Sequence, residues 1–227
     1  MSTVQGGQGN IVTDRLILNL DGANPRSYPP PYNGITWFNL SSDINNGTLV
    51  NGVSYSTSNG GVLVFDNTDD FVNLPNSLGY GTTSLSVFSW YKSNGRPLGD
   101  YHIICGPQVC EISIPWGTGQ LRTGIQTDIR YVSNHGSGLN DGRWHHIGFT
   151  FDGSSKVSYI DGINVGSQSI LTGTLITSFS QRRLGRFGSS TDYYANGNMG
   201  NYSVYNKTLN ESEVLQNYNA TRARFGI

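Results

Sequence analysis

Short runs of alternating apolar and polar residues constrain the fold of this chain more than any other feature. In residues 144–151 (WHHIGFTF), Ile147 and Phe149 fall on the same face as His145, whereas His146 falls on the opposite face. A period of two residues indicates a strand with one face against a core. Because neighbouring residues of a strand point in opposite directions, the two histidines cannot share one metal ion. We interpret both as structural or solvent-facing.

Similar runs recur along the chain and are separated by glycine, proline, asparagine and aspartate turns. They occupy residues 15–20, 36–40, 48–50, 62–65, 71–74, 85–91, 102–105, 110–115, 121–125, 129–132, 144–151, 157–160, 163–166, 183–187 and 199–205. Many short strands without interleaved helices predict an all-β fold, a sandwich of two antiparallel sheets. No period of about 20–50 residues repeats, which argues against a propeller or a solenoid.

One helix is expected, close to the C-terminus. Asn210 and Glu213 have the spacing of a capping box, and Val214, Leu215 and Tyr218 form a short apolar stripe. We therefore expect a helix and tail over 210–227, packed on a sandwich formed by 14–209. Residues 1–13 contain neither a basic segment nor an apolar segment, so they predict a flexible polar arm rather than a secretory signal.

The composition limits the function classes. The chain has 227 residues, of which 13% are charged, and its formal net charge is −1. This balance provides no general attraction to nucleic acid or to an anionic membrane. No run approaches the ~20 apolar residues of a membrane span. Arg182, Arg183 and Arg186 form one local basic cluster, which we interpret as a solvated strand face.

The two cysteines, Cys105 and Cys110, flank a Gly-Pro loop between two strand-like runs. A hairpin here would place the two sulfur atoms close together. Free thiols, a disulfide formed late, and a metal site that includes His102 all remain open for this pair.

Several blocks together resemble the laminin-G-like, concanavalin A-like jelly-roll family. They are residues 18–21 (LNLD), 24–29 (NPRSYP), 36–37 (TW), 45–49 (NNGTL), 60–61, 65–66, 69–72 (DDFV), 144–147 (WHHI), 152–153, 159–162 (YIDG), 204–209 (VYNKTL) and 213–220 (EVLQNYNA). The resemblance implies a jelly-roll sandwich of two curved antiparallel sheets. The opening and closing blocks look like the variant found in virion proteins of tailed bacteriophages. Residues 29–34 and 41–44 depart from the shorter turns of the family.

Relatives in this superfamily include glucanases, which need two carboxylates on either side of the scissile bond. This chain has three glutamates, two of which lie in the expected helix, and Glu111 has no acidic neighbour within six positions. Asp69 and Asp70 would point in opposite directions if they were extended. There is no Gly-x-Ser-x-Gly elbow. We therefore expect no enzymatic activity.

A sugar site would combine an exposed aromatic ring with polar groups that recognise hydroxyls. The candidates near expected loops are Tyr101, His102, Trp116, Asp192 and Tyr193. Each could instead belong to the core or to a cross-strand pair. Relatives often bind calcium through loop aspartates, and Asp66, Asp69 and Asp70 form the matching cluster, although aspartates also simply make turns. We expect no required cofactor, with calcium as the ion that the resemblance suggests.

These expectations lead to a non-enzymatic virion structural protein of a tailed phage, displayed on the particle exterior. It would serve as a capsid decoration protein, as a head fibre, or as an adhesin of the tail or baseplate, and it could contact host surface glycans. The protein would be made in the host cytoplasm and released by lysis. We expect it to form a homo-oligomer and to meet capsid or tail proteins through residues 1–13. The alternative is a secreted or cell-surface carbohydrate-binding module.

Overall fold

The computed structural model describes residues 10–42, 45–76, 80, 83–95, 101–106, 110–115, 117–170, 174–176, 182–187 and 193–227. For residues 101–103 and 106 it describes the backbone. Candidate residues Trp116 and Asp192, and residues 1–9 of the expected arm, therefore lie outside the described part.

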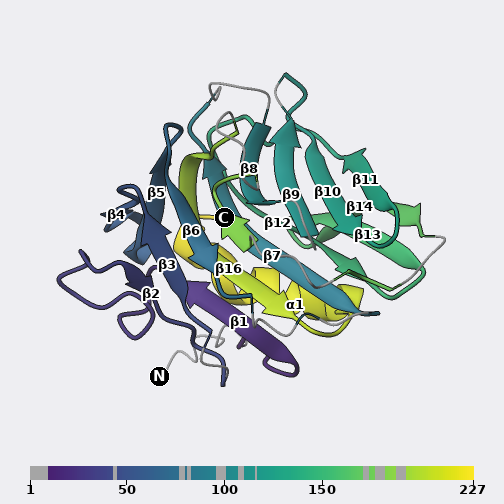
Figure 1. Cartoon of the computed structure of the whole chain (residues 1–227), viewed down its shortest axis with the longest axis horizontal. Helices are drawn as coiled ribbons and strands as arrows, with labels where there is room; N and C mark the ends of the chain where they lie inside the picture. The colour runs from purple at the N-terminus through teal and green to yellow at the C-terminus, as the bar shows by residue number, and fades with distance from the viewer. Residues whose placement is uncertain are drawn as a thin grey trace, which may run out of the picture.

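Two eight-stranded antiparallel sheets pack face to face (Figure 1). Sheet A has the order β14 (Ile163–Ser169), β13 (Ser155–Ile160), β12 (Trp144–Phe151), β7 (Leu85–Ser93), β16 (Asn196–Tyr205), β5 (Val62–Asp66) and β4 (Ser54–Ser56), with β1 (Leu16–Asp21) also paired to β16. Sheet B has the order β11 (Arg130–His135), β10 (Leu121–Gln126), β9 (Cys110–Pro115), β8 (Tyr101–Gly106), β15 (Arg182–Leu184), β6 (Phe71–Leu74), β3 (Gly47–Val50) and β2 (Thr36–Trp37). This arrangement confirms the predicted jelly-roll sandwich.

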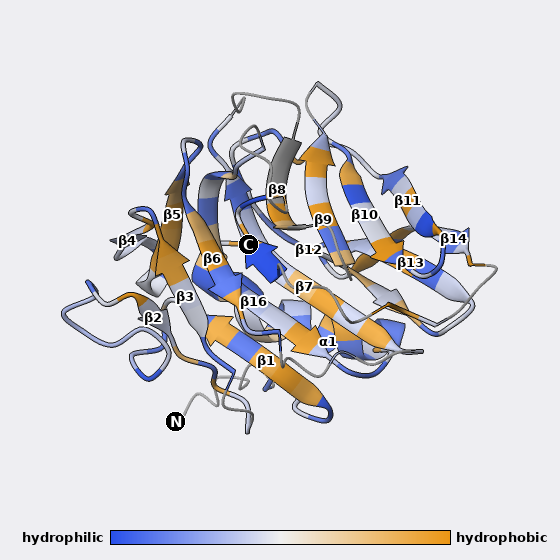
Figure 2. Ribbon diagram, in the orientation of Figure 1, coloured by the Kyte–Doolittle hydropathy of each residue, from blue (hydrophilic) through white to orange (hydrophobic). Residues whose placement is uncertain are grey.

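The main core lies between the sheets, where the inward residues of both meet. Along β9 and β10, bands of apolar and polar residues alternate (Figure 2). Ile112 and Ile114 of β9, with Leu121 and Ile125 of the neighbouring strand β10, point into this core. In β12, Ile147 belongs to the main core, whereas His146 lies on the other face of the sheet and stacks on Phe88 with a centroid distance of 5.1 Å. The predicted opposite orientation of the two histidines is confirmed.

Sheet A also carries apolar side chains on its outer face, and the C-terminal segment covers them. Helix α1 (Glu211–Thr221) and the 3-10 turn η2 (Arg222–Phe225) lie over this face, as does the short turn η1 (Ser58–Gly60) at its margin. Trp90 stacks on Phe225 at 4.4 Å between ring centroids. Gly200 leaves room for this contact, because a Cβ there would lie 2.5 Å from the Phe225 ring. The molecule therefore has a second, smaller core behind sheet A.

The helix begins at the predicted capping box. The Asn210 side chain accepts the backbone N–H of Glu213, and the Glu213 carboxylate accepts that of Asn210. Residues 10–13, the end of the expected arm, contact this helix. Val12 is buried, and its N–H donates to the Asn217 side chain at 2.8 Å.

Strand β4 was missed because its sequence, SYS, has no apolar alternation. The interpretation of the arginine cluster as a solvated face is wrong for Arg182, which is buried and whose guanidinium lies 4.6 Å from the Tyr80 ring centroid, whereas Arg183 and Arg186 are half-buried. Cys105 and Cys110 are free and buried, with their Sγ atoms 3.4 Å apart. Within the described residues, no helix is long and apolar enough to span a bilayer.

Candidate functional site: an acidic turn and a pocket at the start of β12

Three of the five predicted sugar-binding residues fall in the described part, two of them on strand β8 of sheet B. Tyr101 and His102 open β8, where Tyr101 pairs with Pro115 of β9. Their side chains lie outside the described part. Tyr193 lies in the segment that leads to β16, and its ring packs edge-on against Phe187 at 5.8 Å. The structure thus places Tyr193 on an aromatic pair and does not bring it together with β8 in any described contact.

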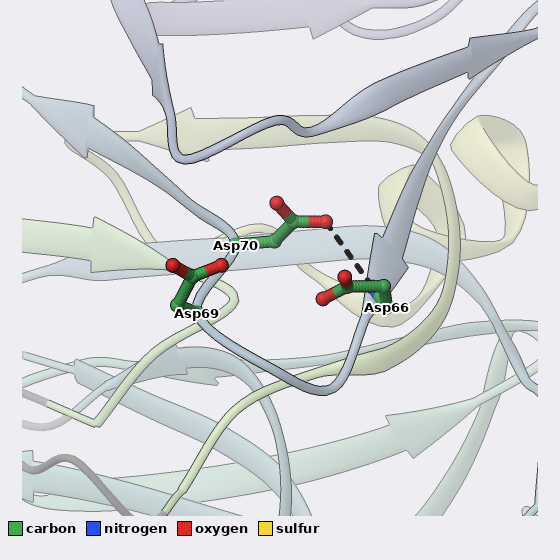
Figure 3. Close-up of side chains that lie close together, drawn as sticks. All are labelled: Asp66, Asp69 and Asp70. Carbon is green, nitrogen blue, oxygen red and sulfur yellow. Dashed lines mark hydrogen bonds between the residues drawn. The ribbon is translucent and has the colours of Figure 1, made fainter.

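The three predicted calcium ligands do come together, on the turn that joins β5 to β6. We call residues 66–70 the acidic turn. One ligand oxygen from each of Asp66, Asp69 and Asp70 lies within 4.8 Å of the others. The carboxylates of Asp66 and Asp69 face each other across the turn, with Asp70 beside them (Figure 3). Because the backbone turns here, the expected opposite orientation of Asp69 and Asp70, which required extended backbone, does not apply.

Two oxygen atoms of the acidic turn are buried and lack a hydrogen-bond partner. Asp70 is 2% exposed, and its Oδ2 accepts the Asp66 N–H at 3.2 Å, whereas its Oδ1 has no partner. The Asn67 Oδ1 is likewise buried and unpartnered. Burial, followed by the charge of Asp66, raises the pKa of Asp70 to about 6. A buried carboxylate with an unused oxygen beside two more carboxylates matches the hard-oxygen ligand set that calcium prefers.

A pocket of about 550 Å³ opens where β12 begins, and sequence reasoning did not find it. We call it the β12 pocket; it is lined by Asp141, Arg143, Trp144, His145, Asp161, Phe225, Gly226 and Ile227. Trp144 and Phe225 are each 6% exposed and pack at 4.6 Å, so they form an apolar floor. The Arg143 side chain is 83% exposed. The lining residues come from three segments that are distant in the sequence. The Asp-Gly turns at Asp141 and Asp161 are the one sequence signal that points to this pocket.

His145 occupies the space between two carboxylates of this pocket. Its Nδ1 lies 2.8 Å from Asp161 Oδ2, and its Nε2 lies 3.2 Å from Asp141 Oδ1. Burial lowers the pKa of His145, but the hydrogen bonds and charges of the two aspartates outweigh burial and raise the pKa overall. Burial raises the pKa of Asp141, but the Arg143 N–H and His145 outweigh it and lower the pKa overall.

This geometry does not suit glycoside hydrolysis. A glycosidase needs one protonated carboxyl group, and it needs the scissile bond in the space between its two carboxyls. In the β12 pocket the imidazole fills that space, and Asp141 is held ionised. Glu111 is also occupied, since its Oε1 accepts from Ser113 Oγ and Arg122 Nε at 2.9 Å each and its Oε2 accepts from Arg130. Neither the pair Asp141 and Asp161 nor Glu111 has the arrangement of a glycosidase carboxyl pair.

Comparison with solved structures finds the same fold in several proteins of low sequence identity. The binding domain of Paraclostridial Mosquitocidal Protein 1 superposes with a TM-score of 0.70 at 16% identity, covering 90% of this chain and 52% of that chain. The binding domain of Botulinum Neurotoxin DC in complex with SialylT gives 0.69 at 13% identity, covering 92% and 52%. The chain thus spans about half the length of these toxin domains. Domain 4 of AbnA, an extracellular arabinanase from Geobacillus stearothermophilus, in complex with arabinotriose, gives 0.64 at 16% identity, covering 91% and 100%.

Sequence comparison identifies the family. A search of curated proteins finds no match. Residues 66–215, which make up more than half of the chain, match the sequence profile described as the concanavalin A-like lectin/glucanases superfamily. The two antiparallel sheets and this match agree, and the chain therefore belongs to the concanavalin A-like lectin/glucanases superfamily.

Proposed function

We propose that this chain is a non-enzymatic carbohydrate-binding domain and that the β12 pocket holds the sugar. The observation that carries the proposal is the make-up of this pocket, with an apolar Trp144 and Phe225 floor beneath Asp141, Arg143 and His145. Apolar side chains suit the C–H face of a sugar ring, and charged groups at the rim recognise its hydroxyls. The similar arabinanase domain and neurotoxin domain, solved in complex with arabinotriose and SialylT respectively, support this class of ligand.

The test is calorimetric titration with neutral oligosaccharides, beginning with arabinotriose. Asp141→Asn and Arg143→Gln each remove a charge from the pocket rim and should weaken binding by about tenfold, the effect of one lost charge-assisted hydrogen bond. Arg26→Gln is the matched control, because Arg26 is exposed on a loop outside the pocket. Equal binding by all three variants and the wild type would reject the pocket. If Tyr193→Ala alone abolished binding, the sugar would lie on sheet B instead. No reducing sugar should be released from any oligosaccharide.

We further propose that the acidic turn binds calcium. The unpartnered Asp70 Oδ1 and the convergence of three carboxylates support this. A bound ion would relieve the mutual repulsion of the carboxylates and join the ends of β5 and β6. Titration with calcium chloride in a metal-free buffer, followed by thermal denaturation, measures the binding.

The biological setting that we propose is the exterior of a tailed-phage virion, as capsid decoration, head fibre or tail or baseplate adhesin. It is supported by the resemblance of the opening and closing sequence blocks. Anchoring of residues 10–13 on α1 would give the preceding residues a defined starting point on the surface. Co-sedimentation with purified capsids, which should require residues 1–9, tests this setting. A secreted or cell-surface module would not bind the capsids.

A further inference from the structure

The two cysteines lie side by side in sheet B, and neither the β12 pocket nor the acidic turn uses them. Cys105 is on β8, opposite Ile112 of β9, and Cys110 begins β9, opposite Ile125 of β10. Their side chains belong to the main core, with exposed fractions of 3% and 6%, and their Sγ atoms are 3.4 Å apart. The neighbouring strands β8 and β9 (Figure 1) therefore hold two free thiols in contact.

The thiol of Cys110 has polar neighbours inside the core. Tyr202 of β16 reaches it from the opposite sheet, and its hydroxyl oxygen lies 3.8 Å from Cys110 Sγ. The Tyr80 hydroxyl is a second hydrogen-bond partner of this sulfur, and the guanidinium of Arg182 lies 4.6 Å from the centroid of the Tyr80 ring. Hydroxyl groups and a nearby positive charge favour the thiolate, which is the reactive form of cysteine.

The surroundings give the two thiols different roles. The hydrogen bond with Cys105 outweighs burial and, with those of the two tyrosine hydroxyls, lowers the pKa of Cys110. Burial raises the pKa of Cys105, and its hydrogen bond with Cys110 adds to this effect. Cys110 is therefore the thiol that ionises first, whereas Cys105 keeps its proton and lies in contact with the sulfur that reacts.

We propose that Cys105 and Cys110 form an oxidation site at which hydrogen peroxide converts the two thiols into an intramolecular disulfide. The Cys110 sulfur attacks one peroxide oxygen and the O–O bond breaks. The leaving hydroxide takes up the proton that Cys110 gave up, which yields a sulfenic acid and water. The Cys105 sulfur then attacks the Cys110 sulfur, the S–O bond breaks, and hydroxide leaves with the Cys105 proton as a second water. Two thiols are oxidised and one peroxide is reduced to two waters.

The surroundings of the pair suit this oxidant and this product. Peroxide is small and uncharged, so it can reach a thiol that larger disulfide reagents cannot. A disulfide bond is about 2.05 Å long, so the two sulfur atoms need to approach by roughly 1.4 Å. The bond would join β8 to β9, and β8 also pairs with β15, so the oxidised form is tied covalently in the middle of sheet B.

The test treats the folded protein with hydrogen peroxide and counts its free thiols after denaturation, which should fall from two to none. The tryptic peptide that contains both cysteines contains no methionine, so methionine oxidation does not change its mass. This peptide should lose the mass of two hydrogen atoms and regain it when a reductant is added.

Variants test the two roles. Cys105→Ser should leave a sulfenic acid on Cys110, which dimedone traps, whereas Cys110→Ser should react about tenfold more slowly, as expected for a thiol of higher pKa. Tyr202→Phe removes a hydroxyl beside Cys110 and should slow disulfide formation about threefold or more. Tyr28→Phe is the matched control, because the Tyr28 hydroxyl donates to the Gly34 carbonyl instead.

Thiols that react only after urea has unfolded the chain would overturn the inference. So would a disulfide that joins two copies of the chain, or equal rates for the two Cys→Ser variants. Equal slowing by Tyr202→Phe and Tyr28→Phe would also count against it. The site shares no residue with the β12 pocket or the acidic turn, so the sugar and calcium titrations succeed or fail independently of this test.

Discussion

Lys156 is a fully buried lysine in the main core. Its ammonium donates to the Thr123 carbonyl at 2.7 Å and to the Tyr131 carbonyl at 3.3 Å. Burial lowers its pKa to about 7, and the nearby Glu111 carboxylate opposes this shift only in part. A lysine in this position makes the stability of the fold depend on pH.

The expected pH dependence has a definite sign. Between pH 7 and the ordinary lysine pKa of 10.5, the unfolded chain binds the proton that the folded chain lacks. The free energy of unfolding should therefore rise with pH in this window, by up to about 1.4 kcal/mol per pH unit from this residue. Lys156→Met should remove that slope. Urea denaturation at pH 7.5, 8.25 and 9 measures it, and an unchanged slope in the variant would contradict the assignment.

The raised pKa of Asp70 predicts that the affinity for calcium depends on pH. Its folded pKa of about 6 lies above the ordinary aspartate pKa of 3.8, so the folded chain holds the extra proton between these values. Without calcium, stability is lost as the pH rises through this window. Calcium must displace the proton, so its affinity should be about tenfold lower at pH 5 than at pH 7. Calorimetry at the two pH values measures the change.

The variant Asp70→Asn separates the two effects. It should abolish calcium binding and raise the stability of the calcium-free protein at pH 7, because it removes a buried charge beside Asp66. Asp152→Asn is the control with opposite sign. The Asp152 carboxylate accepts the N–H groups of Ser154 and Ser155, so its neutralisation should destabilise the protein. If both variants lowered stability equally, the destabilising buried charge assigned to Asp70 would be wrong.

At the scale of elements, the second core behind sheet A should contribute strongly to stability. Phe225 contacts both Trp90 and Trp144, and Phe225→Ala should lower the free energy of unfolding by about 3–5 kcal/mol. Leu215→Ala on the same C-terminal segment is the control, because Leu215 is 45% exposed and its loss should change stability by less than about 1 kcal/mol. Urea denaturation followed by tryptophan fluorescence measures both. Similar values for the two variants would mean that the tail is only loosely attached.

The sequence predicted most elements because their signals are local. Alternation located β7, β9, β10 and β12, and the Asn210 capping box located α1. Strand β13 shows where local signals fail. Its apolar residues Val157 and Tyr159 face the second core, whereas Lys156 points into the main core. An alternation with a period of two residues shows that a strand has two different faces, but it does not show which face packs against the main core.

The sequence predicted the acidic turn but not the β12 pocket. Three aspartates within five residues could be recognised as a cluster, since one turn brings them together. The β12 pocket joins Asp141, Asp161 and Phe225, which no local pattern connects. The arginine cluster was visible, yet the stacking of Arg183 and Arg186 on Phe71 depends on the pairing of β15 with β6.

At the scale of the whole molecule, the exposed edges predict self-association. Strands β14 and β4 end sheet A, and β11 and β2 end sheet B, and an edge strand can pair with a strand of another chain. Ile163 on β14 is 66% exposed. We expect a homo-oligomer in sedimentation, and Ile163→Lys should shift it toward the single chain. Ile129→Lys, at a residue 55% exposed in a turn, should leave it unchanged. A single-chain mass for the wild type would contradict this expectation.

Because α1 and η2 pack over the outer face of sheet A, a partner that approaches from that side meets the helix and not the sheet. If copies of the chain sit on a particle as we propose, attachment through α1 would leave the outer face of sheet B turned away from the support, and Asn10, whose carbonyl accepts from Gln216 of α1, would lie on the attached side.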